Sequence, residues 1–571
     1  MDAVTNILLT PARIGHVEIK NRIVMPSMTT RLADDAGFVT QNTIDYYLAR
    51  ARGGTGLITV EMASPTRAGR HRRRELGMYD DRFVPGLSQL VAAIHAGGAK
   101  ASIQLGHAGG HTRLDICGET PIAPSAIPHP VHEVTDETII PKEMSLDDIG
   151  FTIAGFAAAA ARAEAAGFDC VEIHAAHGYL ISQFVTPFEN RRTDAYGGLL
   201  ENRVRFGLEV LAAIKATVRI PVIYRVSVED FFPQGSPFPE GRQAAIWAAR
   251  AGADALHITA GHYRSLPSAA RMIPPMRYPD ATFLAYATEI RKEADVPVIA
   301  VGRLGDPVVA ETAIAAGQVD FIALGRTLIA EPDWVAKLAR GEPARTCLAC
   351  NTCVNEMRGG ARLGCVVNAT AGEETRYAAA RTPRGERIGV IGAGPAGLTY
   401  ASLVAAGNSV TVFEREKLPG GAFRYAGKAP LFQEVEAEQA SFDRYIEHLV
   451  AACTHRGVVI LYGVDVVAVP EPLRTFDRIV VATGARYRYG LGRLPAKLLG
   501  WGIARWPGIR RLFAAPAFRD WFYYEAREAT GERVVRSLAR PGQKLMMIGD
   551  AAKPGKSKAA ITSAFEAANF F

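Results

Sequence analysis

Four of the seven cysteines lie within a single stretch of 19 residues, and the other three are scattered singly. The four follow the arrangement C-x2-C-x2-C-x11-C and are Cys347, Cys350, Cys353 and Cys365. Four closely spaced thiolates suit a structural zinc ion or an iron–sulfur cluster, because both take four sulfur ligands. The clustering favours a metal site over a disulfide framework.

A second group of reactive side chains lies in IHAAHGYLISQF, which carries His174, His177 and Tyr179 at the end of an apolar segment. Two imidazoles can donate hydrogen bonds to a carbonyl oxygen and so make the β-carbon a better hydride acceptor, while a phenol can protonate the α-carbon. A lone buried histidine is usually a satisfied core residue. Two of them beside a tyrosine favour a catalytic site.

A β/α barrel is the element that positions these side chains. Eight short apolar, β-rich segments occur before residue 330, and most are separated by Ala-rich helical stretches. Near-continuous apolar strands alternating with helices predict a parallel sheet, and eight such units predict a closed (β/α)8 TIM barrel with its active site at the carboxyl ends of the strands. The segments begin at Arg22, Gly56, Lys100, Phe168, Pro221, Ala253, Pro297 and Val319.

Polar residues at the ends of these segments suit a flavin. Arg225 can balance the negative charge of a reduced flavin, and Gln104 can bond its pyrimidine edge. The last two strands end at pairs of glycine and arginine, where β/α barrels bind phosphate and Arg is a fitting counter-ion. A surface ion pair is the alternative for either arginine. The pairs are Gly302 with Arg303 and Gly325 with Arg326.

A new domain opens with GAGPAG, between the apolar strand RIGVI and a helical run, and an acid ends the next strand. Glycines let the backbone approach a pyrophosphate at a helix N-terminus, and the acid accepts a ribose hydroxyl, so the unit predicts a Rossmann-like dinucleotide site. The unit alone leaves NAD and FAD open. Its residues are Gly392, Gly394, Gly397 and Glu414.

Two later segments favour FAD. RIVVATGA and LMMIGDAA, which contains Asp550, resemble the second FAD contact and the flavin-ribityl contact of flavoprotein reductases. Only about 65 residues separate them, and these contain no second glycine fingerprint, so a full NAD(P)H-binding subdomain is missing. The Trp- and Arg-rich segment 494–525 stands there instead, either as a lid over the FAD domain or as a docking face.

Three regions follow from these motifs. We expect the barrel over residues 1–342, a cluster segment and linker over 343–385, and the FAD domain over 386–571. The polar stretch 369–387 indicates the linker.

With these motifs in view, the chain resembles the iron–sulfur branch of the Old Yellow Enzyme family over nearly its full length, through NRIVMPSMTT, SIQLGHAGG, IHAAHGYLISQF, YRVS, CLACNTC, NATAGEE and GAGPAG. The resemblance implies FMN in the barrel, a 4Fe–4S cluster on the cysteines, FAD in the last domain, and NAD(P)H as an electron donor. It implies that His174 and His177 hold a substrate carbonyl, that Tyr179 donates a proton, and that His262 assists it. It places FMN contacts at Pro26, Ser27, Met28, Gln104, Arg225, Arg303 and Arg326.

Composition bounds the class of protein and its partners. Apolar residues make up 48% and charged residues 22% of the 571, the balance of a soluble globular enzyme. The net charge of +7 is spread without a basic run, which favours anionic ligands over nucleic acid. The first residues lack a signal-peptide pattern and no transmembrane span is evident, so we expect a cytoplasmic protein with a small-molecule substrate. A redox partner protein and a homo-oligomer stay open.

Three functions are compatible with these residues. The leading one is an ene-reductase acting on an activated C=C bond of an enone, enoate or enoyl-CoA. The alternative is an amine dehydrogenase or N-demethylase that passes electrons through the cluster to an external acceptor, for which an aromatic bowl around a cationic amine would be evidence. A redox-sensing protein with a vestigial barrel would lack the two histidines and the tyrosine.

Overall fold

The computed structural model describes residues 6–130, 138–378, 384–428, 437–488, 494–538 and 542–570. These residues form two compact units. One comprises Met1–Leu328, Pro332–Ala339 and Cys353–Leu363, and the other comprises Ile329–Glu331, Arg340–Thr352 and Gly364–Phe571.

The region expected as a separate cluster segment and linker, 343–385, is divided between these units. Residues 353–363 belong to the barrel unit. Within the predicted linker, Glu374–Ala378 form the short helix α14, and residues 379–383 lie outside the described part of the chain.

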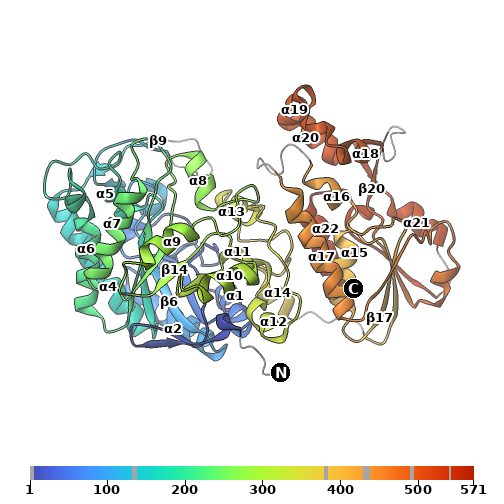
Figure 1. Ribbon diagram of the computed structural model, residues 1–571, viewed down its shortest axis with the longest axis horizontal. Helices are drawn as coiled ribbons and strands as arrows, with labels where there is room; N and C mark the ends of the chain where they lie inside the picture. Colours follow the sequence, from blue (N-terminus) through green and yellow to red (C-terminus); the bar gives the residue numbers. More distant parts are fainter. Residues whose placement is uncertain are drawn as a thin grey trace. The chain divides into compact units, whose positions relative to one another are not determined.

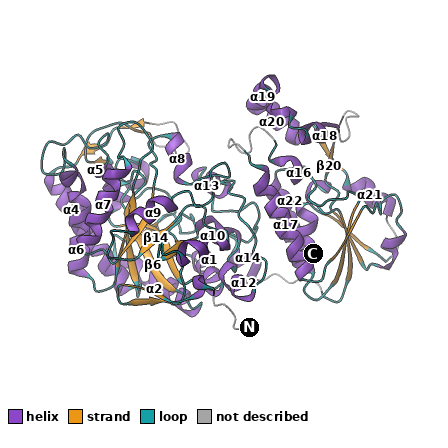
Figure 2. Cartoon of the chain, viewed as in Figure 1, coloured by secondary structure: helices purple, strands orange, loops and turns teal. Residues whose placement is uncertain are grey.

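The first unit is built on the predicted parallel barrel (Figure 1, Figure 2). Its strands pair in the order β3-β15-β14-β13-β12-β11-β6-β4, and β3 also pairs with β4, which closes the sheet. Each of the eight apolar segments supplies one strand, so the TIM-barrel prediction is confirmed. The strands are β3 (Ile23–Met25), β4 (Leu57–Ser64), β6 (Lys100–Leu105), β11 (Cys170–Ala175), β12 (Val222–Ser227), β13 (Ala255–Thr259), β14 (Val298–Ala300) and β15 (Phe321–Ala323).

Amphipathic helices cover the outside of the barrel. The longest, α4, begins at a capping box in which the Ser145 hydroxyl accepts the Asp148 N–H and the Asp148 carboxylate accepts the Ser145 N–H. Its buried face includes Phe156 and the small residues Ala159 and Ala163, which let the helix pack closely. The main helices of the unit are α1 (Gln41–Arg52), α2 (Val84–Ala96), α4 (Leu146–Ala165), α6 (Leu200–Thr217), α7 (Phe238–Arg250), α9 (Leu284–Arg291), α10 (Pro307–Ala315) and α12 (Trp334–Arg340).

A hairpin closes the amino-terminal end of the barrel. Strands β1 (Ala12–Ile14) and β2 (Val17–Ile19) pair antiparallel, and their apolar side chains join a core cluster with residues from the barrel strands. The hairpin fills the amino-terminal end of the barrel. The shorter helices and the loops that carry polar groups lie at the carboxyl end of the strands. Those helices are α3 (Leu114–Cys117), α5 (Leu180–Val185), α8 (Leu266–Met272), α11 (Gly325–Ala330) and α13 (Thr352–Arg358).

The second unit is a Rossmann-like domain, as predicted. Its five strands are parallel, in the order β18-β17-β16-β19-β22. Helix α15 (Pro395–Val404) packs against both α17 (Gln439–His455) and α22 (Ser557–Phe570), and α21 (Gly531–Leu538) joins the core on β19 and β22. The strands are β16 (Arg387–Ile391), β17 (Ser409–Glu414), β18 (Val459–Tyr462), β19 (Arg478–Val481) and β22 (Lys544–Met547).

The Trp-rich segment folds as three short helices, α18 (Leu494–Gly500), α19 (Pro507–Ala514) and α20 (Pro516–Asp520). Leu499 and Phe513 bury themselves in a local apolar cluster, while Trp501 and Trp506 stay 76% and 61% exposed. The segment therefore forms a packed subdomain with aromatic side chains left outside.

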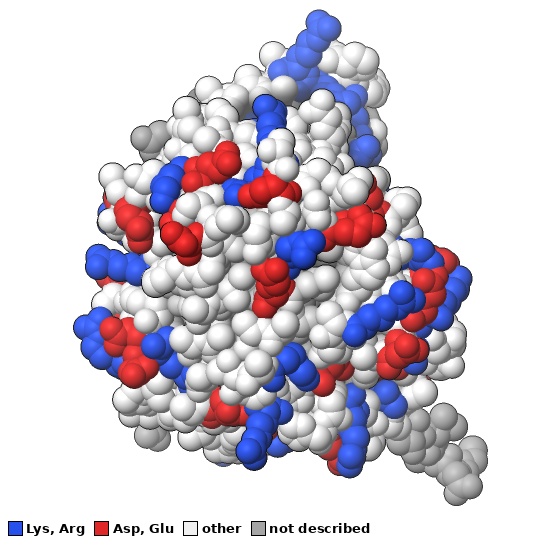
Figure 3. All heavy atoms as spheres, turned by 90° about the vertical axis from the view of Figure 1, so that its left-hand side faces the viewer, with Lys and Arg blue, Asp and Glu red and all other residues white. Residues whose placement is uncertain are grey.

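Charge is mixed on the barrel face turned to the viewer in Figure 3, where basic and acidic side chains alternate. In the described part of the chain, no helix is both long and apolar enough to cross a bilayer.

Candidate active site

The predicted catalytic residues lie at the carboxyl end of β11, where a sharp turn leads into α5. His174 is in the strand, and Tyr179 is the N-cap of the helix. Between them Gly178 has φ +82°, and a Cβ there would lie 2.3 Å from the His262 ring. Only glycine fits this close approach without displacing that ring.

The turn brings three side chains into one buried group. The rings of His174 and His177 are 5.1 Å apart, and those of His174 and Tyr179 are 4.8 Å apart. Their exposed fractions are 4%, 8% and 5%. The structure thus brings together the two histidines and the tyrosine that the sequence singles out.

Both histidines are neutral at pH 7. Burial, together with the nearby Arg225 charge, holds the pKa of His174 and of His177 well below the usual range. His177 Nε2 lies 3.0 Å from the Thr259 hydroxyl, which leaves Nδ1 for another partner. Nδ1 of His174 is buried and makes no hydrogen bond with the described residues. Neutral imidazoles here can donate to an oxygen without adding charge.

The tyrosine hydroxyl has a partner that the sequence analysis missed. Tyr179 Oη lies 2.9 Å from Nδ1 of His71, and Arg72 Nε also donates to this nitrogen, at 3.0 Å. A guanidinium only donates, so Nδ1 is the accepting nitrogen and the proton of a neutral His71 is on Nε2. Burial and the neighbouring Arg72 charge lower the pKa of His71 well below its usual range, which keeps it neutral.

His262, predicted to assist the proton donor, makes its hydrogen bonds with Arg264 and Glu189. Its Nδ1 accepts the Arg264 N–H at 3.0 Å, and its Nε2 lies 3.1 Å from the buried Glu189 carboxylate. Both ring nitrogens are therefore engaged, and the hydrogen-bond partner beside Tyr179 is His71. The loops that carry Glu189 and Arg264 thus determine the hydrogen bonds of the His262 ring.

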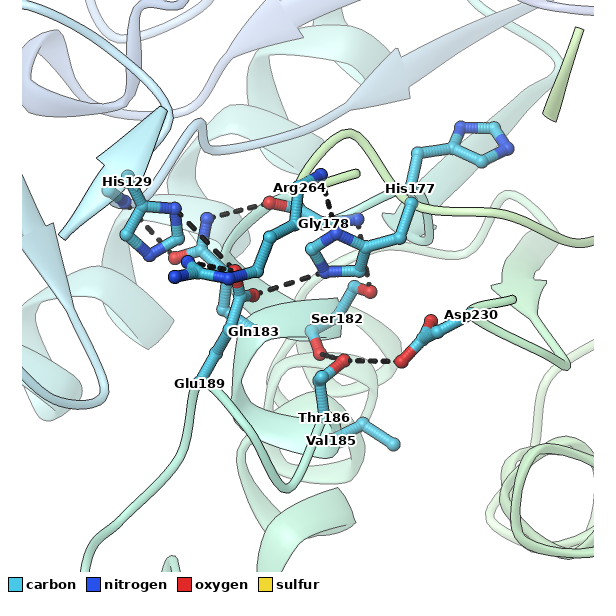
Figure 4. Close-up of polar contacts among 12 residues, drawn as sticks. His129, His177, Gly178, Ser182, Gln183, Val185, Thr186, Glu189, Asp230 and Arg264 are labelled. Carbon is cyan, nitrogen blue, oxygen red and sulfur yellow. Dashed lines mark hydrogen bonds and ion pairs between the residues drawn. The ribbon is translucent and has the colours of Figure 1, made fainter. Parts of the chain in front are cut away.

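Glu189 lies at the centre of a buried charge cluster. Besides His262, the carboxylate contacts Arg264 at 3.3 Å and His129 at 3.6 Å. Burial opposes its ionisation, but the facing histidines and Arg264 still lower the pKa of Glu189 to about 2. Burial likewise opposes protonation of His262, yet Glu189 raises the pKa of His262 above its ordinary value of 6.5. In Figure 4 the His177 ring is turned away from this cluster.

Replacing Glu189 by glutamine should destabilise the barrel unit by about 3 kcal/mol, because it leaves buried cations without their counter-charge. The depressed pKa of Glu189 contributes stability that is present above its ordinary value of 4.5 and lost as pH falls toward 2. The raised pKa of His262 contributes stability that is present below 6.5 and lost at higher pH. The loss of unfolding free energy should thus be largest between pH 4.5 and 6.5, as measured by urea unfolding.

Glu532→Gln, in an exposed ion pair, is the control and should not change the unfolding free energy measurably. Equal unfolding curves for Glu189→Gln and the parent would contradict this account.

The floor of the site is a hydrogen-bonded chain under the predicted flavin. The Gln104 amide donates to Glu172 at 2.7 Å and accepts from the Ser27 hydroxyl at 3.0 Å, and Glu172 is also bonded to His257 at 2.7 Å. These bonds fix the orientation of the amide. Arg225 Nη1 donates to the Ser27 carbonyl, and its buried Nε has no partner among the described residues. An orphaned cationic donor fits the electron-rich N1–O2 edge of a flavin.

At the phosphate site predicted after the last two strands, both arginine side chains are bonded to the protein itself. The Arg303 side chain is held by Asp280 through two bonds of 3.0 and 2.8 Å, and Arg326 donates to the Pro274 carbonyl. The Arg303 charge is therefore already balanced. Gly302 and Arg303 both have positive φ, at +109° and +56°.

Gly325, which follows the last strand, leaves room for the segment that carries Pro26 and Met28. A Cβ at Gly325 would lie 2.9 Å from the Met28 sulfur and 3.4 Å from Pro26. The predicted contacts Pro26, Ser27 and Met28 thus lie directly beside the end of β15.

An aromatic cluster covers Tyr179. Tyr263 lies 5.7 Å from Tyr179 and stacks on His111 at 5.1 Å. Met62 and Met272 join these rings in one apolar cluster. The guanidinium carbon of Arg358 is 5.1 Å from the Tyr263 ring centroid. No sequence motif joins these residues, which come from five separate segments.

In the second unit, the glycine turn has the predicted form. Gly392 has φ +111°, and a Cβ on Gly397 would lie 2.0 Å from the Gly392 carbonyl, so the helix can begin against the strand only with glycines. Glu414 accepts the Ala393 N–H at 2.8 Å. Gly394 is the N-cap of α15. A dinucleotide phosphate fits such a turn.

The predicted ribityl contact, Asp550, is bound to Arg527. One carboxylate oxygen accepts from that guanidinium at 2.8 Å, and the other accepts the Gly555 N–H at 3.1 Å. The predicted residue is present at the sheet end, with its charge balanced by the protein.

Three of the four clustered cysteines lie in the second unit and Cys353 in the first. Cys347 and Cys350 both act electrostatically on Cys365, and the Ala349 N–H donates to Cys347 Sγ at 3.3 Å. Ala349 and Asn351 both have positive φ, which folds the intervening chain tightly. Within the described residues, no three His, Cys, Asp or Glu side chains are arranged as metal ligands.

The fold and this site define a class of flavin-dependent oxidoreductase. A family model described as NADH:flavin oxidoreductase / NADH oxidase matches residues 7–345, and this chain belongs to that family. Residues 390–430 match an NAD(P)-binding Rossmann-like domain. The protein is therefore an oxidoreductase with a flavin-binding barrel.

Curated relatives extend the match beyond the barrel. An NADH oxidase of Thermoanaerobacter brockii is 38% identical over 488 residues, which cover 84% of this chain and 73% of the relative. A cinnamate reductase of Clostridium sporogenes is 31% identical over 526 residues, covering 84% and 74%. An N,N-dimethylglycine/sarcosine dehydrogenase of Chromohalobacter salexigens is 32% identical over 437 residues, covering 74% and 62%.

Among solved structures, a 2-naphthoyl-CoA reductase complex is similar over 99% of both chains, with a TM-score of 0.87 and 23% identity. At that identity the likeness shows a shared fold.

Proposed function

We propose that this oxidoreductase reduces an activated C=C bond conjugated to a carbonyl group. The observation that carries the proposal is the buried group of His174, His177 and Tyr179 at one turn. The 31% identical relative named cinnamate reductase, with an aryl-substituted unsaturated acid in its name, supports this class of substrate.

The chain supplies binding, polarisation and a proton. Neutral His174 and His177 donate hydrogen bonds to the substrate carbonyl oxygen, where negative charge develops as the β-carbon accepts hydride. Tyr179, held at its hydroxyl by His71, then protonates the α-carbon. FMN, when bound, is the hydride donor in this family of reactions. Gln104, Arg225 and the backbone at Ser27 are the residues that we infer hold its ring.

Product analysis tests the proposal. The holoenzyme, incubated without oxygen with NADH or NADPH and cinnamate, should form 3-phenylpropionate, detected by liquid chromatography and mass spectrometry. A reaction with the Tyr179→Phe variant gives the matched background. Complete recovery of cinnamate, with active flavin and either nucleotide, would refute the proposal.

We further infer that the second unit binds FAD and that the four cysteines hold a 4Fe–4S cluster. The glycine turn at Gly392 and the position of Asp550 at the sheet end support FAD over a nicotinamide nucleotide. The Ala349 N–H that donates to Cys347 Sγ is the kind of bond that stabilises cluster sulfur. Four cysteine thiolates also suit zinc, so the metal content of the purified protein distinguishes a zinc site from a cluster.

Anaerobically purified protein should contain about four iron and four sulfide per chain if the cluster is present. Cys347→Ser should abolish this content, because a cluster lacking one thiolate is lost. Cys117→Ser changes a cysteine that lies in the barrel unit and donates to the Arg113 and Glu119 carbonyls, so it should leave the content intact. Zinc in place of iron, or iron unaffected by Cys347→Ser, would contradict the inference.

The amine dehydrogenase alternative has one observation in its favour, the aromatic cluster of Tyr179, Tyr263 and His111. Aromatic faces attract cationic amines. Here, however, the Arg358 guanidinium already lies against Tyr263, so the protein's own cation takes that position. The site therefore favours the reductase.

A further inference from the structure

Two buried nitrogen atoms beside the aromatic cluster have no hydrogen-bond partner among the described residues. They are Nε2 of His71 and Nη2 of Arg358. The first bears the proton of a neutral imidazole whose Nδ1 accepts from Arg72, and the second belongs to a permanent cation. Leaving a buried donor without a hydrogen bond costs free energy, so we expect both nitrogen atoms to donate to oxygen atoms of a ligand.

Arg358 is close to the proton donor. Its guanidinium carbon lies 5.1 Å from the centroid of Tyr263, and that ring lies 5.7 Å from Tyr179. The His71 ring is 5.0 Å from Tyr179 and 6.4 Å from Tyr263. The Arg358 guanidinium and the His71 ring thus both lie beside Tyr263, which packs on Tyr179.

Arg358 does not face the cluster cysteine on its own helix. Cys353 precedes it by five residues on α13, which is about 140° around the helix axis. The guanidinium is therefore oriented to the tyrosine cluster rather than to the thiol.

The side chains around His71 and Arg358 carry a net positive charge. Arg31, Arg72 and Arg358 all lower the pKa of His71 through their charges. The carboxylate bonded to this group is Glu75, which accepts the N–H groups of His71 and Arg72, and burial raises the pKa of Glu75 to about 8. Glu61 is a second buried carboxylate, beside Arg31, and burial raises the pKa of Glu61 to about 7. Even when both carboxylates are ionised, the three arginines outnumber them.

Two of the three arginines have structural bonds. Arg31 Nε donates to the Met357 carbonyl at 2.7 Å, and Arg72 Nε donates to His71 at 3.0 Å. The Arg31 bond ties α13 to the loop after β3, and the Arg72 bond orients the His71 ring. They leave Arg358 as the cation with an orphaned donor.

We propose that the substrate carries a carboxylate, one oxygen of which is the carbonyl oxygen held by His174 and His177, and the other of which is bound by Arg358 and by Nε2–H of His71. The inference rests on the proposed function and narrows its substrates from unsaturated carbonyl compounds in general to unsaturated carboxylic acids. A guanidinium gives a charged, directional hydrogen bond to a carboxylate. A simple amine brings the wrong charge, since three guanidinium groups repel it.

Binding of an unreactive pair of ligands tests the carboxylate site. The FMN-loaded, oxidised protein is titrated with 3-phenylpropionate and with 3-phenylpropanamide, which share a skeleton and differ in charge, and the flavin difference spectrum is followed. The carboxylate should bind at least about tenfold more tightly than the amide. Arg358→Met should weaken the carboxylate by about 30- to 100-fold and leave the amide within about twofold.

Two matched variants complete the design. Arg358→Lys keeps the charge with a different donor geometry, so it should retain part of the preference for the carboxylate. Arg362→Met alters an exposed arginine four residues further along and should change neither affinity. If Arg358→Met does not fold with flavin bound, the Lys variant still decides, because its carboxylate affinity should fall while its amide affinity does not.

Equal binding of carboxylate and amide by the parent protein would overturn the inference, as would equal weakening of both by Arg358→Met. The readout is independent of turnover. Carboxylate binding that depends on Arg358 in a protein that does not reduce cinnamate would refute the proposed function alone. Cinnamate reduction with Arg358-independent binding would refute this inference alone.

Discussion

Tyr179→Phe is expected to slow reoxidation of the reduced flavin by cinnamate by about 10²- to 10⁴-fold, the usual contribution of a positioned proton donor. The variant removes only the hydroxyl that lies 2.9 Å from His71, while the ring keeps its packing on His174 and Tyr263. Reduction of the flavin by NADH or NADPH should stay within about twofold, because that step needs no proton at the substrate α-carbon. Anaerobic stopped-flow absorbance measures the two half-reactions separately.

Tyr224→Phe is the matched control. Tyr224 is also buried in a barrel strand, but its hydroxyl lies against Gly207 of α6, on the outer side of the barrel. Both half-reactions of this variant should equal those of the parent. A Tyr179→Phe protein that reduces cinnamate at the parent rate would show that the proton comes from another group.

His174→Ala should slow the same oxidative half-reaction by about 10²- to 10³-fold, the cost of removing a donor to a developing oxyanion. His174 is 4% exposed, and burial and the Arg225 charge hold its pKa well below the usual range. It therefore acts as a neutral donor. The limiting rate at saturating cinnamate separates polarisation from simple binding, which would appear in the half-saturating concentration.

Conservative and distant replacements distinguish this role from a structural one. His174→Asn keeps an N–H donor and should recover part of the lost rate. His95→Ala removes a partly exposed histidine paired with Asp169 on the outside of the barrel, and it should leave the rate unchanged. If His174→Asn and His174→Ala are equally slow, the ring serves packing rather than donation to the substrate.

Local pattern was enough to predict the framework. Each apolar segment such as FDCVEIHAAH became a barrel strand, because a strand buried on both faces must be apolar throughout. His174, His177 and Tyr179 lie in one turn, so a six-residue window contains the whole group. The glycines at Gly392 and Gly397 were equally readable, since their spacing is the geometry of a single strand-to-helix turn.

Contacts between distant segments could not be predicted. The partner of Tyr179 is His71, 108 positions away, and Arg358 reaches Tyr263 from beyond the last barrel strand. Neither pair forms a local motif. Arg303 was expected to bind phosphate, but the loop that carries Asp280 neutralises its side chain. Such pairings depend on how loops meet at the barrel mouth, which no periodicity encodes.

The most direct test compares an unsaturated acid and an amine on the same protein. Flavin reduced anaerobically with dithionite is mixed with cinnamate, and oxidised flavin is mixed with N,N-dimethylglycine, while the flavin absorbance is followed. We expect cinnamate to restore the oxidised spectrum with formation of 3-phenylpropionate, and dimethylglycine to leave the oxidised spectrum unchanged. Bleaching by dimethylglycine, with no reoxidation by cinnamate, would contradict it and identify an amine dehydrogenase.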